Sequence, residues 1–121
     1  MPVLIDIENL IQEARESSLD EAFITVDTGP CHRLGIGVKL EDGVVMEFFI
    51  EILLRLGKPG LVKDSKNLQS IFSFISYLDH RGYTVRLQED SSISCERKLN
   101  SSQIESECLT ILESDMFPPN C

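Results

Sequence analysis

The chain of 121 residues has the length of one domain, which is large enough to bury a core of its own. A hydrophobic content of 42% with 26% charged residues excludes disorder throughout the chain. The 20 acidic and 11 basic side chains give a net charge of -9, which argues against binding to nucleic acid or to an anionic membrane.

The N-terminal segment, MPVLIDIENL, has no cationic stretch before its apolar residues and soon reaches Asp6 and Glu8. It is therefore unlike a secretory signal peptide, and we expect a cytoplasmic location. Between about residues 3 and 18, apolar side chains recur at the spacing of one helix face, which predicts a first helix. These apolar positions are Ile7, Leu10, Ile11 and Ala14.

Two segments with the composition of strands follow. Residues 22–27 (AFITVD) are rich in β-branched and aromatic side chains, and a Thr-Gly-Pro turn at 28–30 ends this first strand. Residues 33–41 alternate between apolar positions and glycine or polar positions, which predicts a second, half-buried strand. Asp42 and Gly43 come next, and both accept the positive φ that a two-residue hairpin turn requires.

The run from Val44 to Leu56 is the longest apolar stretch, and two interpretations of it stay open. As a strand, it pairs back through the preceding turn; as a helix, it places Glu47, Glu51 and Arg55 on one exposed face. The turn chemistry favours a strand over the first half, and the second half fits a longer strand or a short helical piece. The run is too short to cross a bilayer and contains charged residues, so we expect no membrane contact.

A Gly-Lys-Pro-Gly sequence interrupts the pattern, and a helix follows it. Asp64 or Ser65 is a suitable N-cap, and Gly82 lies where a left-handed residue ends many helices. The apolar stripe that we expect to face the core consists of Leu68, Ile71, Phe72, Ile75 and Leu78. Phe74 and Tyr77 fall outside this stripe, so we expect them on an exposed apolar patch.

Two short strands and a helix complete the chain. Residues 83–88 alternate between apolar and polar side chains, and after an acidic turn a fifth strand covers about 93–99. The sequence at 102–105, Ser-Gln-Ile-Glu, has the spacing of a capping box and predicts the start of the last helix. We expect a single domain over residues 1–115 and a flexible C-terminal tail over residues 116–121.

Together these elements predict an α+β fold with the order α-β-β-β-α-β-β-α. Because the strands are joined by tight hairpins, we expect an antiparallel sheet of about five strands with helices packed on one face. The element order and the acidity are similar to those of the small acidic α/β dimeric chaperones of bacterial secretion systems. This resemblance is one of topology and includes no shared motif.

Gly35 and Gly37 lie on the same face of the predicted second strand. They lack the third glycine and the strand-to-helix context of a dinucleotide-binding loop. We therefore expect them to mark a close approach by backbone, by a helix or by a partner chain.

Cys31, His32 and His80 have the chemistry of a catalytic or metal site. A thiolate activated by an imidazole is a nucleophile, but neighbouring residues of an extended chain point apart, so His80 would have to supply the imidazole. No cysteine or histidine spacing matches a known metal motif, and we expect no cofactor. Cys95 and Cys108 fall on apolar faces, and we expect them in the core.

Two hypotheses for the function stay open. The first is a protein-binding or assembly module without catalytic activity that forms a homodimer, because the long apolar run exceeds what one face of a small sheet requires. Its candidate interface residues are Val45, Phe49, Phe74 and Tyr77. The second is a small enzyme, or a metal or redox protein, centred on Cys31, His32 and His80.

Overall fold

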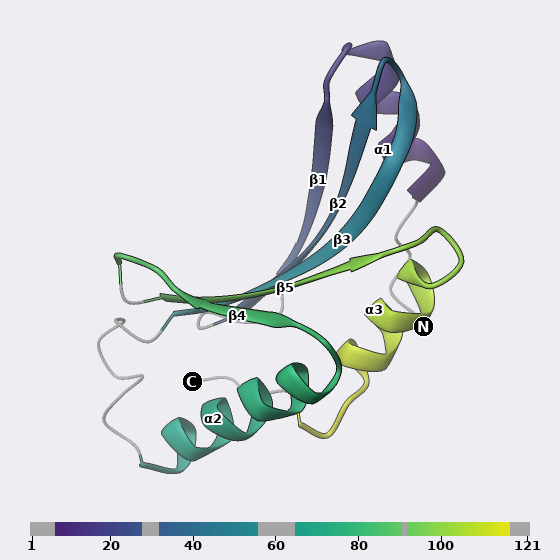
Figure 1. Ribbon diagram of the computed structural model, residues 1–121. Helices are drawn as coiled ribbons and strands as arrows, with labels where there is room; N and C mark the ends of the chain where they lie inside the picture. The colour runs from purple at the N-terminus through teal and green to yellow at the C-terminus, as the bar shows by residue number, and fades with distance from the viewer. Residues whose placement is uncertain (1–6, 28–31, 56–64, 91, 117–121) are drawn as a thin grey trace.

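The computed structural model describes residues 7–27, 32–55, 65–90 and 92–116 (Figure 1). These residues contain three helices and five strands, and the predicted order α-β-β-β-α-β-β-α is confirmed. In chain order the elements are α1 (Ile7–Glu16), β1 (Glu21–Asp27), β2 (His32–Glu41), β3 (Val44–Arg55), α2 (Ser65–His80), β4 (Thr84–Leu87), β5 (Ser92–Leu99) and α3 (Ile104–Leu112). Most of the predicted tail and the first residues of the predicted first helix lie outside the described residues.

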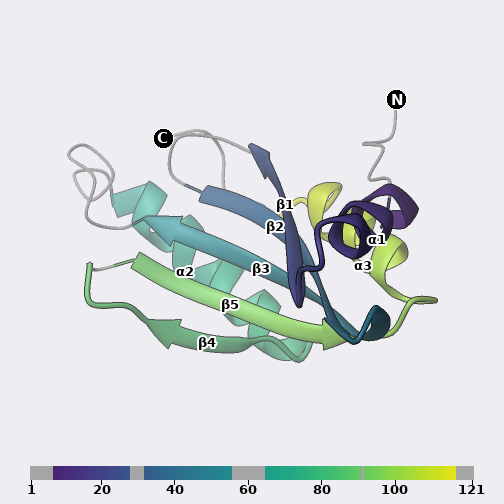
Figure 2. The same cartoon turned by 90° about the horizontal axis from the view of Figure 1, so that it is seen from above.

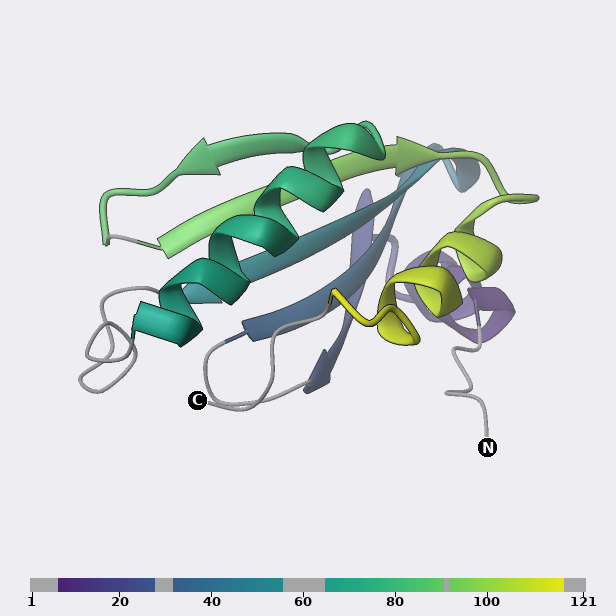
Figure 3. The same cartoon turned by 90° about the horizontal axis from the view of Figure 1, so that it is seen from below.

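The five strands form one antiparallel sheet in the order β1-β2-β3-β5-β4. The sheet is strongly twisted, and Figure 1 shows β1, β2 and β3 rising away from β4 and β5. Helices α2 and α3 lie against one face, as Figure 3 shows from below. Seen from above in Figure 2, the opposite face of β3, β5 and β4 carries no helix of the described chain, and we call it the uncovered face.

The β2–β3 hairpin turns at Asp42 and Gly43, whose φ angles are 51° and 79°, so the predicted turn is confirmed. β3 continues as a strand to Arg55, which excludes the helical interpretation of this run. It is the central strand of the sheet, between β2 and β5. Its apolar composition therefore reflects a position inside the sheet and does not by itself indicate a dimer surface.

Helix α2 presents a different stripe to the core from the one predicted. Ile71, Phe74 and Leu78 are buried, whereas Phe72 is 53% exposed. Residues two positions apart lie about 200° apart around a helix, so only one of these two phenylalanines can face the sheet. The expectation that Phe72 is in the core and Phe74 on an exposed patch is therefore wrong.

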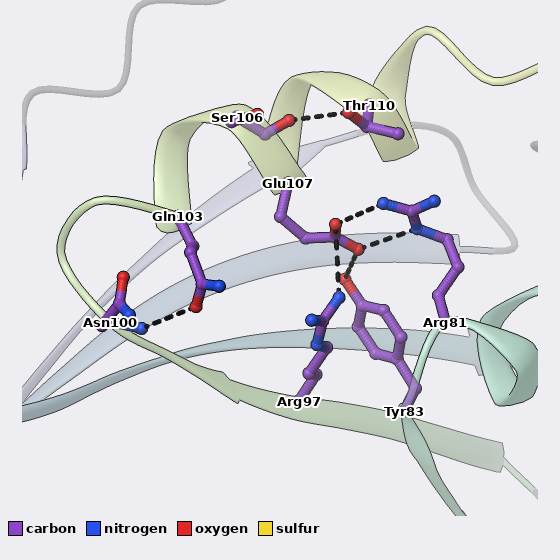
Figure 4. Close-up of polar contacts among 8 residues, drawn as sticks. All are labelled: Arg81, Tyr83, Arg97, Asn100, Gln103, Ser106, Glu107 and Thr110. Atoms are coloured by element: carbon purple, nitrogen blue, oxygen red, sulfur yellow. Dashed lines mark hydrogen bonds and ion pairs between the residues drawn. The ribbon is translucent and has the colours of Figure 1, made fainter.

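The ends of the helices follow local rules, with one correction. Gly82 has a φ of 93°, and the Tyr83 N–H donates to the Leu78 carbonyl at 3.0 Å, so the predicted end of α2 is confirmed. The capping box predicted at 102–105 is wrong in position, because α3 begins at Ile104 without a side-chain cap. Similar contacts come two residues earlier. The Asn100 side chain accepts the Ser102 N–H at 3.1 Å. The Gln103 side chain accepts the Asn100 N–H at 3.4 Å (Figure 4).

One hydrophobic core joins all three helices to the sheet. Alternate residues of β2 and β3 supply its floor, and α1 supplies Ile7, Leu10 and Ala14. Cys95 and Cys108 are buried in the same core as free thiols, which confirms their predicted place. The polar and exposed features that bear on function therefore lie on the uncovered face, at the sheet edges and at the helix ends.

Candidate protein-binding surface

The structure does not bring the two histidines of the enzyme hypothesis together. His32 is the first residue of β2 and is buried, whereas His80 is the exposed last residue of α2, with its Nδ1 2.7 Å from the Ser76 carbonyl oxygen. Figures 2 and 3 show the start of β2 and the C-terminal end of α2 in different parts of the molecule. Cys31 lies outside the described residues. Within the described part of the chain, no three His, Cys, Asp or Glu side chains are grouped to hold a metal ion.

The two described cysteines do not have the character of nucleophiles. Burial raises the pKa of the Cys95 thiol to about 11, and burial together with the nearby Glu107 charge raises that of Cys108 to about 11. Both thiols are therefore protonated at neutral pH, and a thiol is a much weaker nucleophile than a thiolate. Their role in the described structure is packing.

A cluster of charged groups surrounds Glu107 of α3, which is 6% exposed. Arg81 donates two hydrogen bonds to its carboxylate, one from Nε to Oε2 at 3.1 Å, and the Tyr83 hydroxyl donates to Oε2 at 3.0 Å (Figure 4). A guanidinium nitrogen of Arg97 lies 3.3 Å from Oε1. We call these four residues the Glu107 cluster. It joins α3 to the end of α2 and to β5.

At neutral pH the carboxylate and the two guanidinium groups of the Glu107 cluster are ionised, and the Tyr83 hydroxyl is protonated. Burial raises the pKa of Glu107, but the hydrogen bonds from Arg81 and Tyr83 and the two guanidinium charges outweigh it and hold the pKa below its ordinary value. Burial, and then the Glu107 charge, raises the pKa of Tyr83, while the hydrogen bond to Glu107 raises that of Arg81. Because each charge already has its partner, the cluster stabilises packing and offers no spare group for a reaction.

Two aromatic rings fill the space above Gly35 and Gly37 on the uncovered face. Phe23 of β1 and Phe49 of β3 both pair with Gly37, and a Cβ added at Gly35 or Gly37 would overlap the ring of Phe23 or Phe49 respectively. The two rings stack with centroids 5.9 Å apart, and Lys39 Nζ lies 5.5 Å from the Phe49 centroid. Aromatic rings of the neighbouring strands, rather than a helix or a partner chain, therefore approach these glycines.

Two carboxylates oppose one another on the same face. Glu51 of β3 pairs directly with Glu96 of β5. Burial raises the pKa of Glu51 above its ordinary value, and the charges of Glu96 and then Glu21 raise it further. Like charges directly across a sheet destabilise it, so this pair is a local electrostatic cost.

The four predicted interface residues are mostly packed inside the chain. Phe74 is fully buried and stacks on the half-buried Tyr77, with centroids 6.3 Å apart. Phe49 is 5% exposed and is the buried member of the ring pair described above. Val45 is half-buried beside the core. These residues therefore do not form a common exposed surface.

A different set of apolar side chains is exposed on one side of the molecule. Leu87 and Val85 of β4 are 76% and 36% exposed, and Phe72 of α2 is 53% exposed. Val85 and Leu87 pair with the buried Cys95 and Ile93, which places their side chains on the helix-covered face next to α2. We call Phe72, Val85 and Leu87 the α2–β4 surface.

The geometry of α2 directs Phe72 towards this side. Arg81 contacts both Tyr77 and Glu107, so the flank of α2 that carries Tyr77 faces α3. Phe72 lies about 140° around the helix from Tyr77, on the opposite flank, where β4 forms the edge of the sheet (Figure 3). The exposed apolar residues of α2 and β4 therefore share one side of the molecule.

The sequence did not predict this surface, because its residues have the pattern of core residues. Val85 and Leu87 alternate as strand residues that face a core do, and Phe72 fits the helical stripe. The short length of β4 and its position at the sheet edge leave the side chains of Val85 and Leu87 exposed.

Comparison of the chain with protein-family models, with curated proteins and with solved structures found no match in any of the three. The likeness to secretion chaperones is therefore one of element order and acidity alone. No helix within the described residues is long and apolar enough to cross a membrane.

Proposed function

We propose that this protein is a protein-binding assembly module without catalytic activity, and that it forms a homodimer through the α2–β4 surface. The observation that carries the proposal is the exposure of Phe72, Val85 and Leu87 on one side of the chain. Apolar groups gathered on a surface commonly mark a site of protein association, because water solvates them poorly.

The position of β4 supports an interface at this side. β4 is an edge strand of only four residues, and all four are exposed. The short length of β4 and the charge of Arg86 limit pairing along this edge, but Val85 and Leu87 still expose apolar side chains on its helix-covered face. A second molecule that binds at this edge would cover the exposed apolar side chains and the unpaired backbone of β4.

A second copy of the chain is the occupant that fits this surface. A two-fold dimer places the same patch on both partners, and an apolar patch is complementary to itself. Each copy carries a net charge of -9, so the copies repel one another until salt screens that charge. We therefore expect dimerisation to strengthen as the ionic strength rises.

Light scattering coupled to size exclusion tests the proposal. The wild-type chain should have twice its mass of 13.6 kDa, and Leu87→Lys should have the mass of a monomer. Lysine is chosen because it lowers the net negative charge, so that loss of the dimer cannot result from added overall repulsion.

Met46→Lys is the matched control. Met46 is 59% exposed and lies at the start of β3, which is far from β4, so this variant should remain a dimer. Circular dichroism confirms that both variants are folded. A wild-type monomer at high concentration and high salt, or two variants with the same mass, would overturn the proposal.

A further inference from the structure

One stretch of the central strand has a partner on only one side. β5 ends opposite Phe48, where Phe48 pairs with Leu99. Residues 44–47 therefore pair with β2 alone, and no described strand lies along their other edge. Met46 is at a β-bulge, since Lys39 pairs with Glu47 and Leu40 with Val45. This short edge presents backbone groups that an added strand can pair with.

A groove of about 550 Å³ lies along this edge. Its walls include Ile11 of α1 and Gln103 in the turn before α3. Phe48, a core residue, lines it from the helix-covered face. Glu47 and Lys98, which form a 3.8 Å ion pair, line it from the uncovered face. The groove thus lies beside the edge of β3 that is left unpaired beyond its last pair with β5.

We infer that this edge groove binds an extended, basic segment of a partner protein, which adds as a short strand beside residues 44–47 of β3. The inference rests on the proposed protein-binding function and names the class of partner. Backbone pairing supplies the affinity in this mode of recognition, and alternate side chains supply the specificity. The exposed side chains of Val44 and Met46, at 60% and 59%, are the apolar contacts available to such a segment.

An extended chain fits this groove more readily than a second copy does. Ile11 of α1 and the turn at 100–103 contribute to its walls beside residues 45–48 of β3. A second copy would bring the same walls against these ones before two β3 edges could pair. A single extended chain has no such walls and occupies little more than the width of one strand, about 4.8 Å.

The charge of the chain, rather than that of the groove lining, favours a basic segment. The charged residues that line the groove are Glu47 and Lys98, which pair with one another. Outside the lining, helix α1 carries three glutamates, at positions 8, 13 and 16, against the single Arg15, whose Nε donates to the Gly43 carbonyl oxygen at 2.8 Å. The chain as a whole has a net charge of -9, so its field attracts cations and repels acidic peptides.

A fluorescent peptide with alternating lysine and valine residues is the probe, and anisotropy reports its binding to the full chain. We expect saturable binding that weakens as salt is added, and no binding of the peptide in which glutamate replaces lysine. Two further peptides carry N-methyl groups on alternate residues, one on the odd positions and one on the even positions. Strand addition uses the N–H groups of one peptide edge, so one N-methylated peptide should bind like the parent and the other should not bind.

Two variants of the protein show where the peptide binds. Met46→Lys should weaken binding at least about fivefold, which is close to 1 kcal/mol. Leu87→Lys adds the same charge on the distant β4 and should bind the peptide normally, although it is expected to be monomeric. Peptide binding by the Leu87→Lys monomer would therefore support the groove even if the dimer proposal failed.

Three results would overturn the inference. Equal weakening by Met46→Lys and Leu87→Lys would mean that the peptide responds only to overall charge. Equal binding of the two N-methylated peptides would exclude backbone pairing. A self-association that Met46→Lys abolishes and Leu87→Lys leaves intact would make a second copy, rather than a peptide, the occupant of the groove.

Discussion

At the scale of single residues, two glutamates have opposite environments. The carboxylate of Glu107 accepts hydrogen bonds from Arg81 and Tyr83, and these partners lower its pKa despite burial. Glu51 is partly buried opposite Glu96, and its pKa is raised. Folding therefore favours the ionised form of Glu107 and the protonated form of Glu51, and the two should respond to acid in opposite directions.

Replacing Glu107 should lower stability in a way that depends on pH. Glu107→Gln leaves two guanidinium groups without their carboxylate, and we expect a loss of about 2–3 kcal/mol in the free energy of unfolding at pH 7. Because the folded pKa is lowered, the contribution of Glu107 is complete above about pH 4.3 and is lost as the pH falls through the folded value. The difference between wild type and variant should therefore shrink in acid.

Urea unfolding from neutral to acidic pH measures this difference. Glu105→Gln is the control, since Glu105 is exposed on the same helix, and it should change stability by less than about 0.5 kcal/mol. An equal loss for both variants, or a gap that stays constant in acid, would show that the Glu107 cluster does not act as an ion pair.

Removing the charge of Glu51 should instead stabilise the protein. Glu51→Gln relieves the repulsion from Glu96, and we expect a gain of about 0.5 kcal/mol at pH 7. With a raised folded pKa, the wild type regains stability as the pH falls through that value, so the advantage of the variant should disappear in acid. Thermal unfolding of the single variants and of the double variant with Glu96→Gln checks this. A double variant that gains the sum of the two single effects would contradict a shared repulsion.

Residue patterns predicted the positions that depend on local chemistry. The left-handed residues at Asp42, Gly43 and Gly82 are found where turn and cap rules place them. The exposure of Phe72 and the burial of Phe74 were not predictable, because two stripes of helical spacing are possible, one through Phe72 and one through Phe74. Which phenylalanine is buried depends on the flank of α2 that α3 covers, and only the tertiary packing decides this.

At the scale of elements, the strands β1, β2 and β3 are tied together by rings above glycine. Phe49 is almost completely buried over Gly37, whereas Phe23 over Gly35 is 44% exposed. A methyl group at either glycine must displace a ring. The exposed ring can rotate into solvent, and the buried ring cannot do so without disturbing its neighbours.

The two glycines should therefore differ in their tolerance of alanine. Gly37→Ala should cost about 1–3 kcal/mol through overpacking against Phe49. Gly35→Ala should cost clearly less, because Phe23 moves away. Denaturant titration of both variants gives the comparison. Equal costs, or a larger cost at Gly35, would contradict this account of the ring packing.

Element order and sheet type were predictable because each strand and helix has a local signature. The central position of β3 was harder to predict from the sequence, because an apolar run of this length fits a helix, a central strand or an interface equally well. The start of α3 shows the same limit, because Asn100 and Gln103 share the spacing of the predicted Ser102 and Glu105 box. Similar local signals compete, and tertiary packing selects between them.

At the scale of the whole molecule, the exposed features divide between the two ends of the sheet. The α2–β4 surface is apolar and lies at the β4 edge, and the groove beside residues 44–47 lies at the hairpin end. A dimer through the first surface leaves the second free on each copy. Salt should strengthen the apolar self-association and weaken the binding of a basic segment, so the two interactions can be separated by ionic strength.

The measurement that tests the dimer most directly is hydrogen–deuterium exchange of the unmodified chain at two concentrations. On dilution from about 200 µM to about 2 µM, a dimer that dissociates in this range must lose protection at its interface. The account predicts faster exchange in the segments that contain Phe72, Val85 and Leu87, with α1 and β1 unchanged. A chain of monomer mass at both concentrations, or a change on dilution that is confined to β1, would contradict it.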